Sequence, residues 1–199
     1  MYIKHTSAPL PFQGQKRNFI KQFKEALKGF PENAIYVDLF GGSGLLSHTV
    51  KTEKPNAKVI YNDFDNFKER LESIPLTNEI ISKLKPILID LNKNSKIPIC
   101  LKSKVLKIIK SYDNIGFVDY ITLSSNLLFS MKYVQSFKDL EKQTFYNNLR
   151  KSVYKNNGYL QNVEFIHDDY KSVFEKYRKH DNIVFLVVSS ISKHRLFNL

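Results

Sequence analysis

The stretch Ala34-Ile-Tyr-Val-Asp-Leu-Phe-Gly-Gly-Ser-Gly44 decides the fold of this chain. Its first part, residues 34–40, is a short and mostly apolar run, which predicts a buried β-strand. The strand runs into three glycines, and glycine permits the positive φ angles and close backbone approaches of a sharp turn. Residues 45–52 then have the pattern of a helix. A strand, a glycine turn and a helix in this order are typical of the first unit of an α/β nucleotide-binding domain.

The details of the glycine turn narrow the class of ligand. The dinucleotide fingerprint G-x-G-x-x-G requires a third glycine where this chain has Ser47, and no Gly-Lys-Ser/Thr of a Walker loop follows. What remains is a carboxylate, Asp38, that leads into a turn open to close approach by a ligand. This pattern suits a ligand with a cationic ammonium group and no pyrophosphate, and S-adenosylmethionine fits that description. The alternative is a tight strand-to-helix turn that binds nothing.

Three further apolar segments predict strands that pair with the first. They cover residues 58–63, 163–167 and 182–188, while residues 19–27 and 172–179 have helical patterns. The predicted fold is therefore an open, largely parallel α/β sheet of Rossmann type, with its ligand crevice at the carboxyl ends of the strands. Asp63 ends the second strand, where such folds place a carboxylate that accepts hydrogen bonds from ribose hydroxyls. A solvated turn acid is the alternative.

The sequence changes character between the second and third predicted strands. Residues 66–157 show helical patterns and polar breaks, which predict a helical insertion in an α/β core of residues 1–65 and 158–188; residues 189–199 form a divergent tail. Four lysines of the insertion are candidates for a basic surface: Lys102, Lys104, Lys107 and Lys110. In a second segment, aromatic residues alternate with a cation: Phe145, Tyr146, Arg150 and Tyr154. A solvated basic helix face is the alternative, so we assign no base-reading residue.

Composition narrows the protein class. The 199 residues suffice for one α/β domain with an insertion, and 31 Lys and Arg against 19 Asp and Glu give a formal charge of +12. Such a charge is typical of proteins that bind polyanions, although AT-rich coding sequence also enriches lysine. No apolar run is long enough to cross a bilayer. Cys100 is the sole cysteine, which excludes an internal disulfide and a multi-cysteine zinc site. We expect a cytoplasmic protein without membrane or metal partners.

Several motifs together resemble the Dam-type (D12 class) DNA adenine methyltransferases. Pro11-Phe-Gln-Gly-Gln-Lys-Arg17 is similar to the family's G-G-K loop, with Gln15 in place of the second glycine. Asp38-Leu-Phe-Gly-Gly-Ser-Gly44 is close to its D-x-F-x-G-S-G cofactor motif, and Tyr61-Asn-Asp-Phe-Asp65 is similar to the segment with the ribose-binding acid. Asp168-Asp169-Tyr170 is similar to its D-F or D-Y pair. Order and spacing agree from Pro11 to Val187.

The resemblance implies a Rossmann-like methyltransferase that transfers a methyl group from S-adenosylmethionine to the N6 amino group of adenine in double-stranded DNA. It implies that the insertion contains the target-recognition region. It also implies a restriction–modification, phage or mobile-element system, in the first case with a cognate restriction endonuclease that is linked in function but not bound. The cofactor-binding residues that the resemblance assigns, with Lys16 at the cofactor site and Asp169 at its adenine, are Gln13, Lys16, Asp38, Phe40, Gly41, Gly42, Ser43, Gly44, Asp63 and Asp169.

The chain departs from this family after the last predicted strand. There the family carries D-P-P-Y, which orients the adenine amino group and stacks on the flipped base. This chain reads Val188-Ser189-Ser190-Ile191 instead, so no catalytic residue is identifiable, and the later strands of the family's sheet are missing. We therefore predict a truncated or frame-shifted form with negligible methyl transfer. The alternatives are a non-catalytic module that binds cofactor, DNA or both, and an RNA or small-molecule methyltransferase with a different amine-orienting group.

Overall fold

The computed structural model describes residues 3–129 and 132–187. Its strands β1 (Ile35–Asp38), β2 (Lys58–Asn62), β3 (Glu164–Ile166) and β4 (Ile183–Leu186) form a parallel sheet in the order β3-β2-β1-β4. At the carboxyl end of β1, Asp38 lies opposite Tyr61 of β2 and Leu186 of β4. All four predicted strands are present, and the expectation of a parallel α/β sheet of Rossmann type is confirmed.

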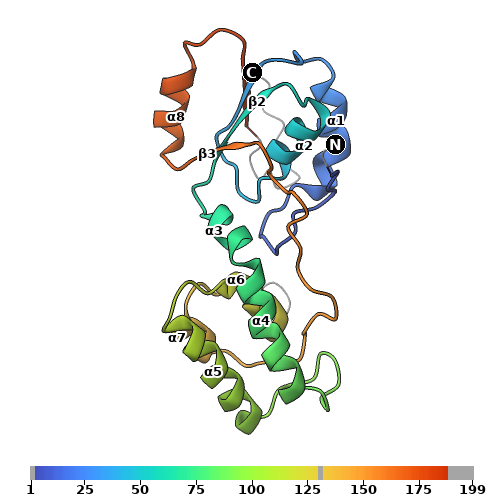
Figure 1. The fold of residues 1–199 in the computed structure, drawn as a ribbon, viewed down its shortest axis with the longest axis vertical. Coiled ribbons are helices and arrows are strands. Elements are labelled where there is room, and N and C mark those ends of the chain that lie inside the picture. Colours follow the sequence, from blue (N-terminus) through green and yellow to red (C-terminus); the bar gives the residue numbers. More distant parts are fainter. Residues whose placement is uncertain (1–2, 130–131, 188–199) are drawn as a thin grey trace, which may run out of the picture. The chain divides into compact units, whose positions relative to one another are not determined.

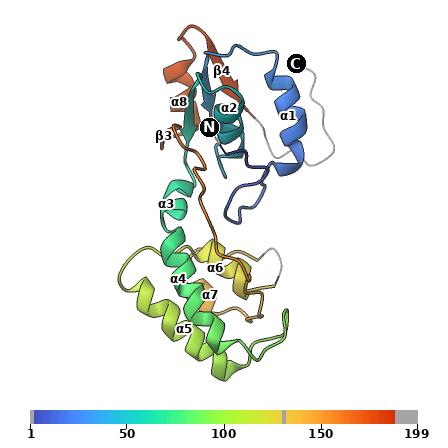
Figure 2. The ribbon, with the colours of Figure 1, turned by 45° about the vertical axis from the view of Figure 1, so that its right-hand side comes forward.

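Helices cover both faces of this sheet (Figures 1 and 2). α8 (Tyr170–Tyr177) lies on one face, where its apolar residues join a buried cluster of Val37, Leu39, Ile60, Val173 and Tyr177. α1 (Ile20–Leu27) and α2 (Leu45–Glu53) lie on the other face. Side chains alternate along a strand, so Asp38, next to Val37, points toward α2. The glycine turn between β1 and α2 therefore begins in a buried environment.

α8 begins two residues before the start at 172 that its apolar pattern predicts. Asp169 is the N-cap residue, and its carboxylate accepts a hydrogen bond from the backbone N–H of Lys171 at 2.9 Å. A carboxylate in this position satisfies a backbone donor that the first helical turn leaves without a partner. The acidic motif after β3 thus also starts the helix.

The chain divides into two compact units. The sheet unit comprises Gly14–Lys68 together with the parts of the chain up to Ala8 and from Asn157, and the helical unit comprises Pro9–Gln13 and Glu69–Asn156. This division differs from the expected core boundary at residues 1–65, because Pro9–Gln13 belongs to the helical unit. The reason is local: Leu10 is buried, and the Arg70 guanidinium donates a hydrogen bond to the carbonyl of Pro11 at 2.7 Å.

The helical unit is built from short helices around a shared apolar core. They are α4 (Ile74–Leu84), α5 (Ile99–Asp113), α6 (Tyr120–Leu127) and α7 (Phe137–Glu141), with the 3-10 turn η2 (Lys85–Ile87) after α4; α3 (Phe67–Glu72) begins in the sheet unit, and the 3-10 turn η1 (Arg17–Phe19) precedes α1. A buried ion pair joins Arg70 Nε to Asp119 Oδ1 at 3.0 Å, and the same carboxylate caps α6 by accepting from the N–H of Thr122.

The described residues contain neither a helix suited to cross a bilayer nor a cluster of metal-binding side chains. Within residues 3–129 and 132–187, no helix combines the length and apolar character that a bilayer crossing requires. The same part of the chain holds no group of three or more His, Cys, Asp or Glu side chains that could hold a metal ion. The expected position of the missing tetrapeptide, Val188 to Ile191, and the tail 189–199 lie outside the described residues.

Candidate functional site

A pocket of about 370 Å³ lies at the carboxyl ends of β1, β2 and β3. Each strand end contributes to its lining: Leu39, Phe40, Gly41 and Gly42 follow β1, Asn62 ends β2 and is followed by Phe64 and Asp65, and Asp169 and Tyr170 lie at the start of α8 after β3. Parallel sheets of this type bind ligands at this edge. The pocket is therefore the first candidate for the functional site.

The glycine turn has a geometry that other residues would disrupt. Gly42 and Gly44 have φ angles of 52° and 70°, which residues with a Cβ rarely adopt. At Gly41 the restriction is spatial, because a Cβ would lie 2.1 Å from the Tyr61 ring and 2.7 Å from the carbonyl oxygen of Asn62. The predicted need for glycine thus has two different physical causes within one turn.

Asp38 lies beneath the turn and is almost fully buried. Its carboxylate accepts a hydrogen bond from Ser47 Oγ at 2.7 Å, and further hydrogen bonds come from the backbone at Phe40 and Ser47. Burial raises the pKa of this carboxyl to about 6, although the hydrogen bonds oppose the shift. Asp38 does not line the pocket, so in this structure it organises the turn, and its contact with a ligand stays a prediction.

Asp63 has a similar organising position at the end of β2. Its two carboxylate oxygens accept from the backbone N–H groups of Phe67 at 2.6 Å and Lys68 at 2.8 Å, at the start of α3. Tyr61 Oη lies 3.0 Å from Asp63 Oδ1 and 2.7 Å from the carbonyl oxygen of Gly42. The carboxylate therefore connects α3 to the glycine turn, and its contact with ribose stays a prediction.

Asn62, the residue before Asp63, joins the three strand ends. Its Nδ2 donates to the carbonyl of Leu39 at 3.2 Å and to that of Asp168 at 2.9 Å, and its Oδ1 accepts from the N–H of Asp168 at 3.1 Å. Sequence reasoning assigned no role to Asn62. A polar residue at the end of a buried strand is the signal that could have identified it, since a buried amide needs several partners.

Exposed aromatic side chains form the rim of the pocket. Phe40 packs against Tyr170 with ring centroids 4.9 Å apart, and Phe64 stacks on His167 at 5.6 Å with an angle of 14° between the rings. Phe64 is 63% exposed, an unusual degree for a phenylalanine. Asp65 and Asp169 add two carboxylates to the lining. A pocket with aromatic walls and acidic groups suits a ligand that joins a planar ring to a positive charge.

The other predicted residues of the sheet unit do not line the pocket. Ser43 and Gly44 belong to the inner side of the turn, where Tyr159 Oη donates to the carbonyl of Ser43 at 2.9 Å. Lys16 precedes η1 and does not line the pocket, and Gln13 is exposed in the helical unit. The structure thus brings Phe40, Gly41, Gly42 and Asp169 together in the pocket, and the role of Gln13 and Lys16 stays a prediction.

Residues that follow the helical unit pack against the glycine turn at residues 41–44, and sequence reasoning missed this contact. Leu160 has a φ of 58°, and its side chain occupies the space that a Cβ on Gly44 would enter, at 2.6 Å. Its N–H donates to His48 Nδ1 at 3.2 Å, while His48 Nε2 donates to the carbonyl of Ile3 at 3.0 Å. Burial lowers the pKa of His48 to about 4, so the ring is neutral at pH 7.

Comparison with known proteins now identifies the family. A family model described as D12 class N6 adenine-specific DNA methyltransferase matches residues 12–186. The chain belongs to this family. A Haemophilus influenzae protein named "Putative methyltransferase" is 38% identical over 190 residues, which cover 90% of this chain and 62% of that relative. The chain therefore spans less than two thirds of the relative's length.

Proposed function

We propose that the sheet unit binds S-adenosylmethionine, as part of a protein built to methylate the N6 amino group of adenine in double-stranded DNA. The observation that carries the proposal is the pocket at the three strand ends, with Gly41 and Gly42 in its wall. The family match supports the choice of reaction.

The residues of the pocket fit this cofactor in chemical type. S-adenosylmethionine supplies an electrophilic methyl group on a sulfonium and carries an ammonium and an adenine ring. The glycine backbone at Gly41 and Gly42 allows close approach, the two carboxylates favour positive charge, and the aromatic rim suits a planar base. We assign these contacts to Phe40, Phe64, Tyr170, Asp65 and Asp169.

The buried acids have a different role in this proposal. Asp38 and Asp63 position the turn and α3, because their carboxylates are engaged by Ser47 Oγ and by backbone N–H groups. Asp65, two residues after Asp63, lines the pocket and becomes the candidate for the ribose hydroxyls. Lys16 and Gln13 remain candidates from the family resemblance alone.

Methyl transfer by the 199-residue chain is a separate question. Transfer to an amino group requires that its nitrogen be held toward the methyl, and displacement by about 1 Å already costs about a hundredfold in rate. Val188 and Ile191 provide neither a hydrogen-bond acceptor nor an aromatic face through their side chains. We therefore propose cofactor binding with negligible methyl transfer, in a cytoplasmic protein of a restriction–modification or mobile-element system. Appreciable adenine methylation by this chain, on DNA with many sequence contexts, would refute that part.

Cofactor binding is tested by calorimetry and thermal shift with S-adenosylmethionine and S-adenosylhomocysteine. A ligand that binds only the folded state raises its thermal midpoint in a concentration-dependent manner. We expect such a shift for the unmodified chain and a reduced shift for Phe64→Ala, which removes an exposed ring from the pocket rim. Absence of any shift with either ligand would contradict the proposed function.

A second candidate is a non-catalytic module that binds cofactor, DNA or both. The sequence Val188-Ser189-Ser190-Ile191 in place of the family tetrapeptide favours it. Salt-dependent DNA binding without binding of S-adenosylmethionine would favour this module over the proposed function. If neither ligand binds, both candidates fail.

A further inference from the structure

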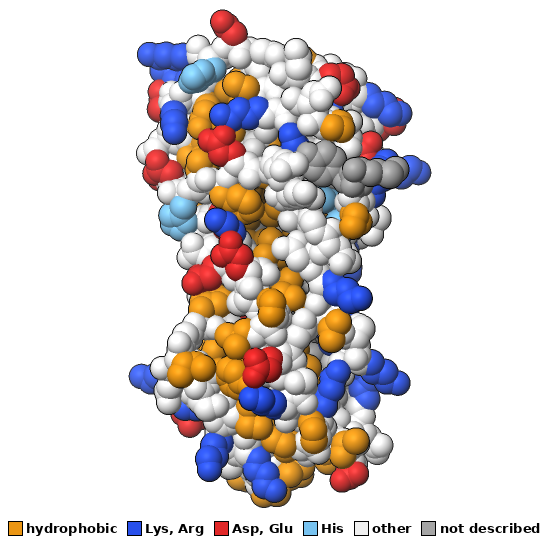
Figure 3. Space-filling view, viewed as in Figure 1, with side chains coloured by type: hydrophobic (Ala, Val, Ile, Leu, Met, Phe, Trp, Pro, Cys, Tyr) orange, Lys and Arg blue, Asp and Glu red, His pale blue; other side chains and the backbone are white. Residues whose placement is uncertain are grey.

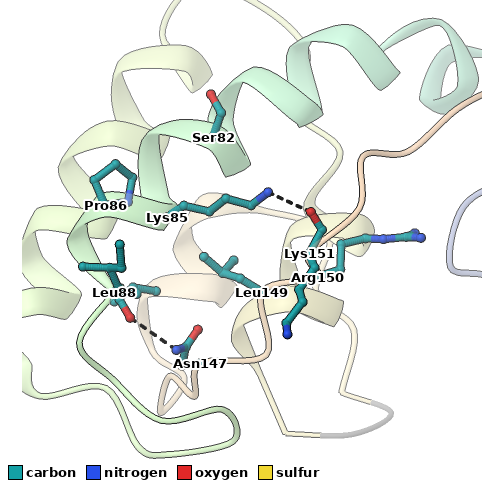
Figure 4. A pocket seen from close by; sticks show the side chains of 9 residues that line it. Ser82, Lys85, Pro86, Leu88, Asn147, Leu149, Arg150 and Lys151 are labelled. Carbon is teal, nitrogen blue, oxygen red and sulfur yellow. Dashed lines mark hydrogen bonds between the residues drawn. The ribbon is translucent and has the colours of Figure 1, made fainter.

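A second hollow lies in the helical unit, on residues that the cofactor proposal does not use. It is a groove of about 530 Å³ between the end of α4, η2 and residues 147–151 (Figure 4). Lys85, Arg150 and Lys151 supply three cations to its lining, and no acidic residue contributes to it. Pro86, Leu88 and Leu149 supply apolar surface. The groove thus combines positive charge with an apolar floor.

The wall of the groove is held in place although residues 145–154 form no helix or strand of their own. Backbone bonds hold the first part of this segment, where the N–H groups of Tyr146 and Asn147 donate to the carbonyls of Leu127 at 2.7 Å and Ser95 at 2.9 Å. Side-chain amides add further bonds: Asn126 Oδ1 accepts from the N–H of Arg150 at 3.1 Å, and Asn147 Nδ2 donates to the carbonyl of Leu91 at 2.8 Å. Asn78 Nδ2 donates to the carbonyl of Tyr154 at 2.9 Å, and Asn78 Oδ1 accepts from the N–H of Tyr154 at 2.8 Å. Since these bonds fix the backbone, the groove is preorganised.

The cations of the groove differ in their existing contacts. Lys85 Nζ donates to the carbonyl of Lys151 at 3.1 Å, so the Lys85 side chain crosses the groove (Figure 4). The Arg150 guanidinium lies 4.2 Å from the centre of the Tyr154 ring and donates to Ser152 Oγ. Among the described residues, none of these contacts is with a carboxylate, so no carboxylate competes with an external anion at Lys85 or Arg150.

The predicted basic surface on α5 provides a comparison. Lys102 Nζ donates to the carbonyls of Glu141 and Gln143, and Lys110 forms an ion pair with Asp113 at 2.7 Å. Lys104, Lys107 and Lys110 are the exposed members of that set. Basic side chains of the helical unit lie scattered on the face drawn in Figure 3, so position rather than net charge distinguishes the groove.

We infer that this groove holds the backbone of one DNA strand, with phosphates at Lys85 and Lys151 and deoxyribose faces on the apolar floor. The inference rests on the proposed function for its choice of polyanion and assigns the place where that polyanion is held. Charge complementarity favours a phosphate chain, because three cations and no acid line the groove. The contact positions the DNA without reading its sequence.

The test is a fluorescence anisotropy titration of a labelled DNA duplex over a range of salt concentrations. The groove variant is Lys85→Gln with Lys151→Gln, and the matched control is Lys104→Gln with Lys107→Gln, which removes the same charge from α5. Each phosphate contact contributes about one unit to the slope of log affinity against log salt. We expect the groove variant to lose about two units of slope and about tenfold or more in affinity at low salt, and the control to stay close to the unmodified chain.

Each outcome decides the inference. An unchanged groove variant, or equal losses in both variants, overturns the groove as the DNA site but leaves cofactor binding untouched. If the unmodified chain binds no DNA, the inference fails together with the DNA part of the proposed function. Circular dichroism and denaturant titration report whether the helical unit of each variant is folded. Lys151→Glu, a single change at an exposed residue, serves as a second variant and is expected to weaken DNA binding as well.

Discussion

Two irregular segments of this protein each form the wall of a pocket, and they are held by different means. The glycine turn at residues 41–44 depends on what is missing from the side chain, because its φ angles and tight spaces exclude a Cβ. Residues 150–154 in the wall of the other pocket depend on side chains that are distant in the sequence, since Asn126 bonds the backbone of Arg150 and Asn78 bonds that of Tyr154. The first device is local and visible in the sequence. The second joins residues far apart in the chain and appears only in the structure.

The largest effect is expected where the glycine turn has no space. Gly41→Ala places a Cβ 2.1 Å from the Tyr61 ring and 2.7 Å from a backbone oxygen, and the backbone cannot move aside cheaply. We expect a loss of about 3 kcal/mol in the free energy of unfolding, typical of severe overpacking, and loss of cofactor binding. Denaturant titration and thermal shift measure both. Gly29→Ala is the control, because its Cβ would approach only Ala26 O, at 3.6 Å; equal losses in the two variants would contradict the steric argument.

The second prediction concerns the hydrogen bonds between the Asn78 side chain and the backbone of Tyr154. Asn78→Ala leaves the N–H and carbonyl of Tyr154 without their partner, which costs about 2 kcal/mol for buried groups. Asn78→Asp keeps the acceptor for the N–H and loses the donor to the carbonyl, so we expect a smaller loss. Denaturant titration of both variants gives the comparison. If Asn78→Ala leaves the free energy of unfolding unchanged, the two hydrogen bonds of Asn78 do not hold this segment.

A third prediction uses the pH dependence of the glycine turn. Burial raises the pKa of Asp38 to about 6 in the folded protein, above its ordinary value of 3.8, so the folded state binds more protons than the unfolded state between these values. The contribution of Asp38 to stability therefore increases as the pH falls from about 6 to 4, by an amount on the order of 2 kcal/mol. Asp38→Asn removes this increase, so the free energy of unfolding of the variant falls relative to that of the unmodified chain as the pH is lowered from about 6 to 4. Parallel pH profiles for the two proteins would contradict the shift.

His48 gives the opposite sign on the other side of the same turn. Its pKa is lowered to about 4, so the unfolded state binds a proton first as the pH falls below 6.5, and the folded state loses stability between pH 6.5 and 4. His48→Gln is expected to reduce this acid sensitivity. Denaturant titrations at pH 7 and pH 4.5 measure it, and an acid sensitivity equal to that of the unmodified chain would exclude His48 as its source.

The smallest effect is expected at the pocket rim. Asp65→Asn removes one exposed carboxylate that lines the pocket, and we expect about tenfold weaker binding of S-adenosylmethionine, or about 1.4 kcal/mol. Stability stays near that of the unmodified chain, because the residue is exposed. Asp63→Asn is the contrasting variant, in which stability falls because α3 loses its cap. If Asp63→Asn weakens binding of S-adenosylmethionine without loss of stability and Asp65→Asn leaves binding unchanged, the ribose contact is assigned to Asp63.

The sequence predicts the sheet well because its signals are local. Apolar runs identified all four strands, and the glycines marked the turn after β1. The roles of Asp38 and Asp63 could not be predicted from the sequence, since an acidic residue after a strand gives the same sequence pattern whether it contacts a ligand or hydrogen-bonds a buried turn. Asn62 and Leu160 were missed because their importance comes from partners such as Asp168 and Gly44, which are distant in the sequence. The groove of the helical unit has the same origin.

The return of the chain at residues 157–162 has a practical consequence for protein engineering. Asn157, Gly158, Leu160 and Asn162 all have positive φ angles, and this coil supplies Tyr159 and Leu160 to the underside of the glycine turn. Anyone who excises the helices to obtain a minimal domain, or who opens new termini by circular permutation, must keep this coil. Cutting upstream of Asn157 leaves the turn's support intact, whereas a cut between Gly158 and Asn162 removes it.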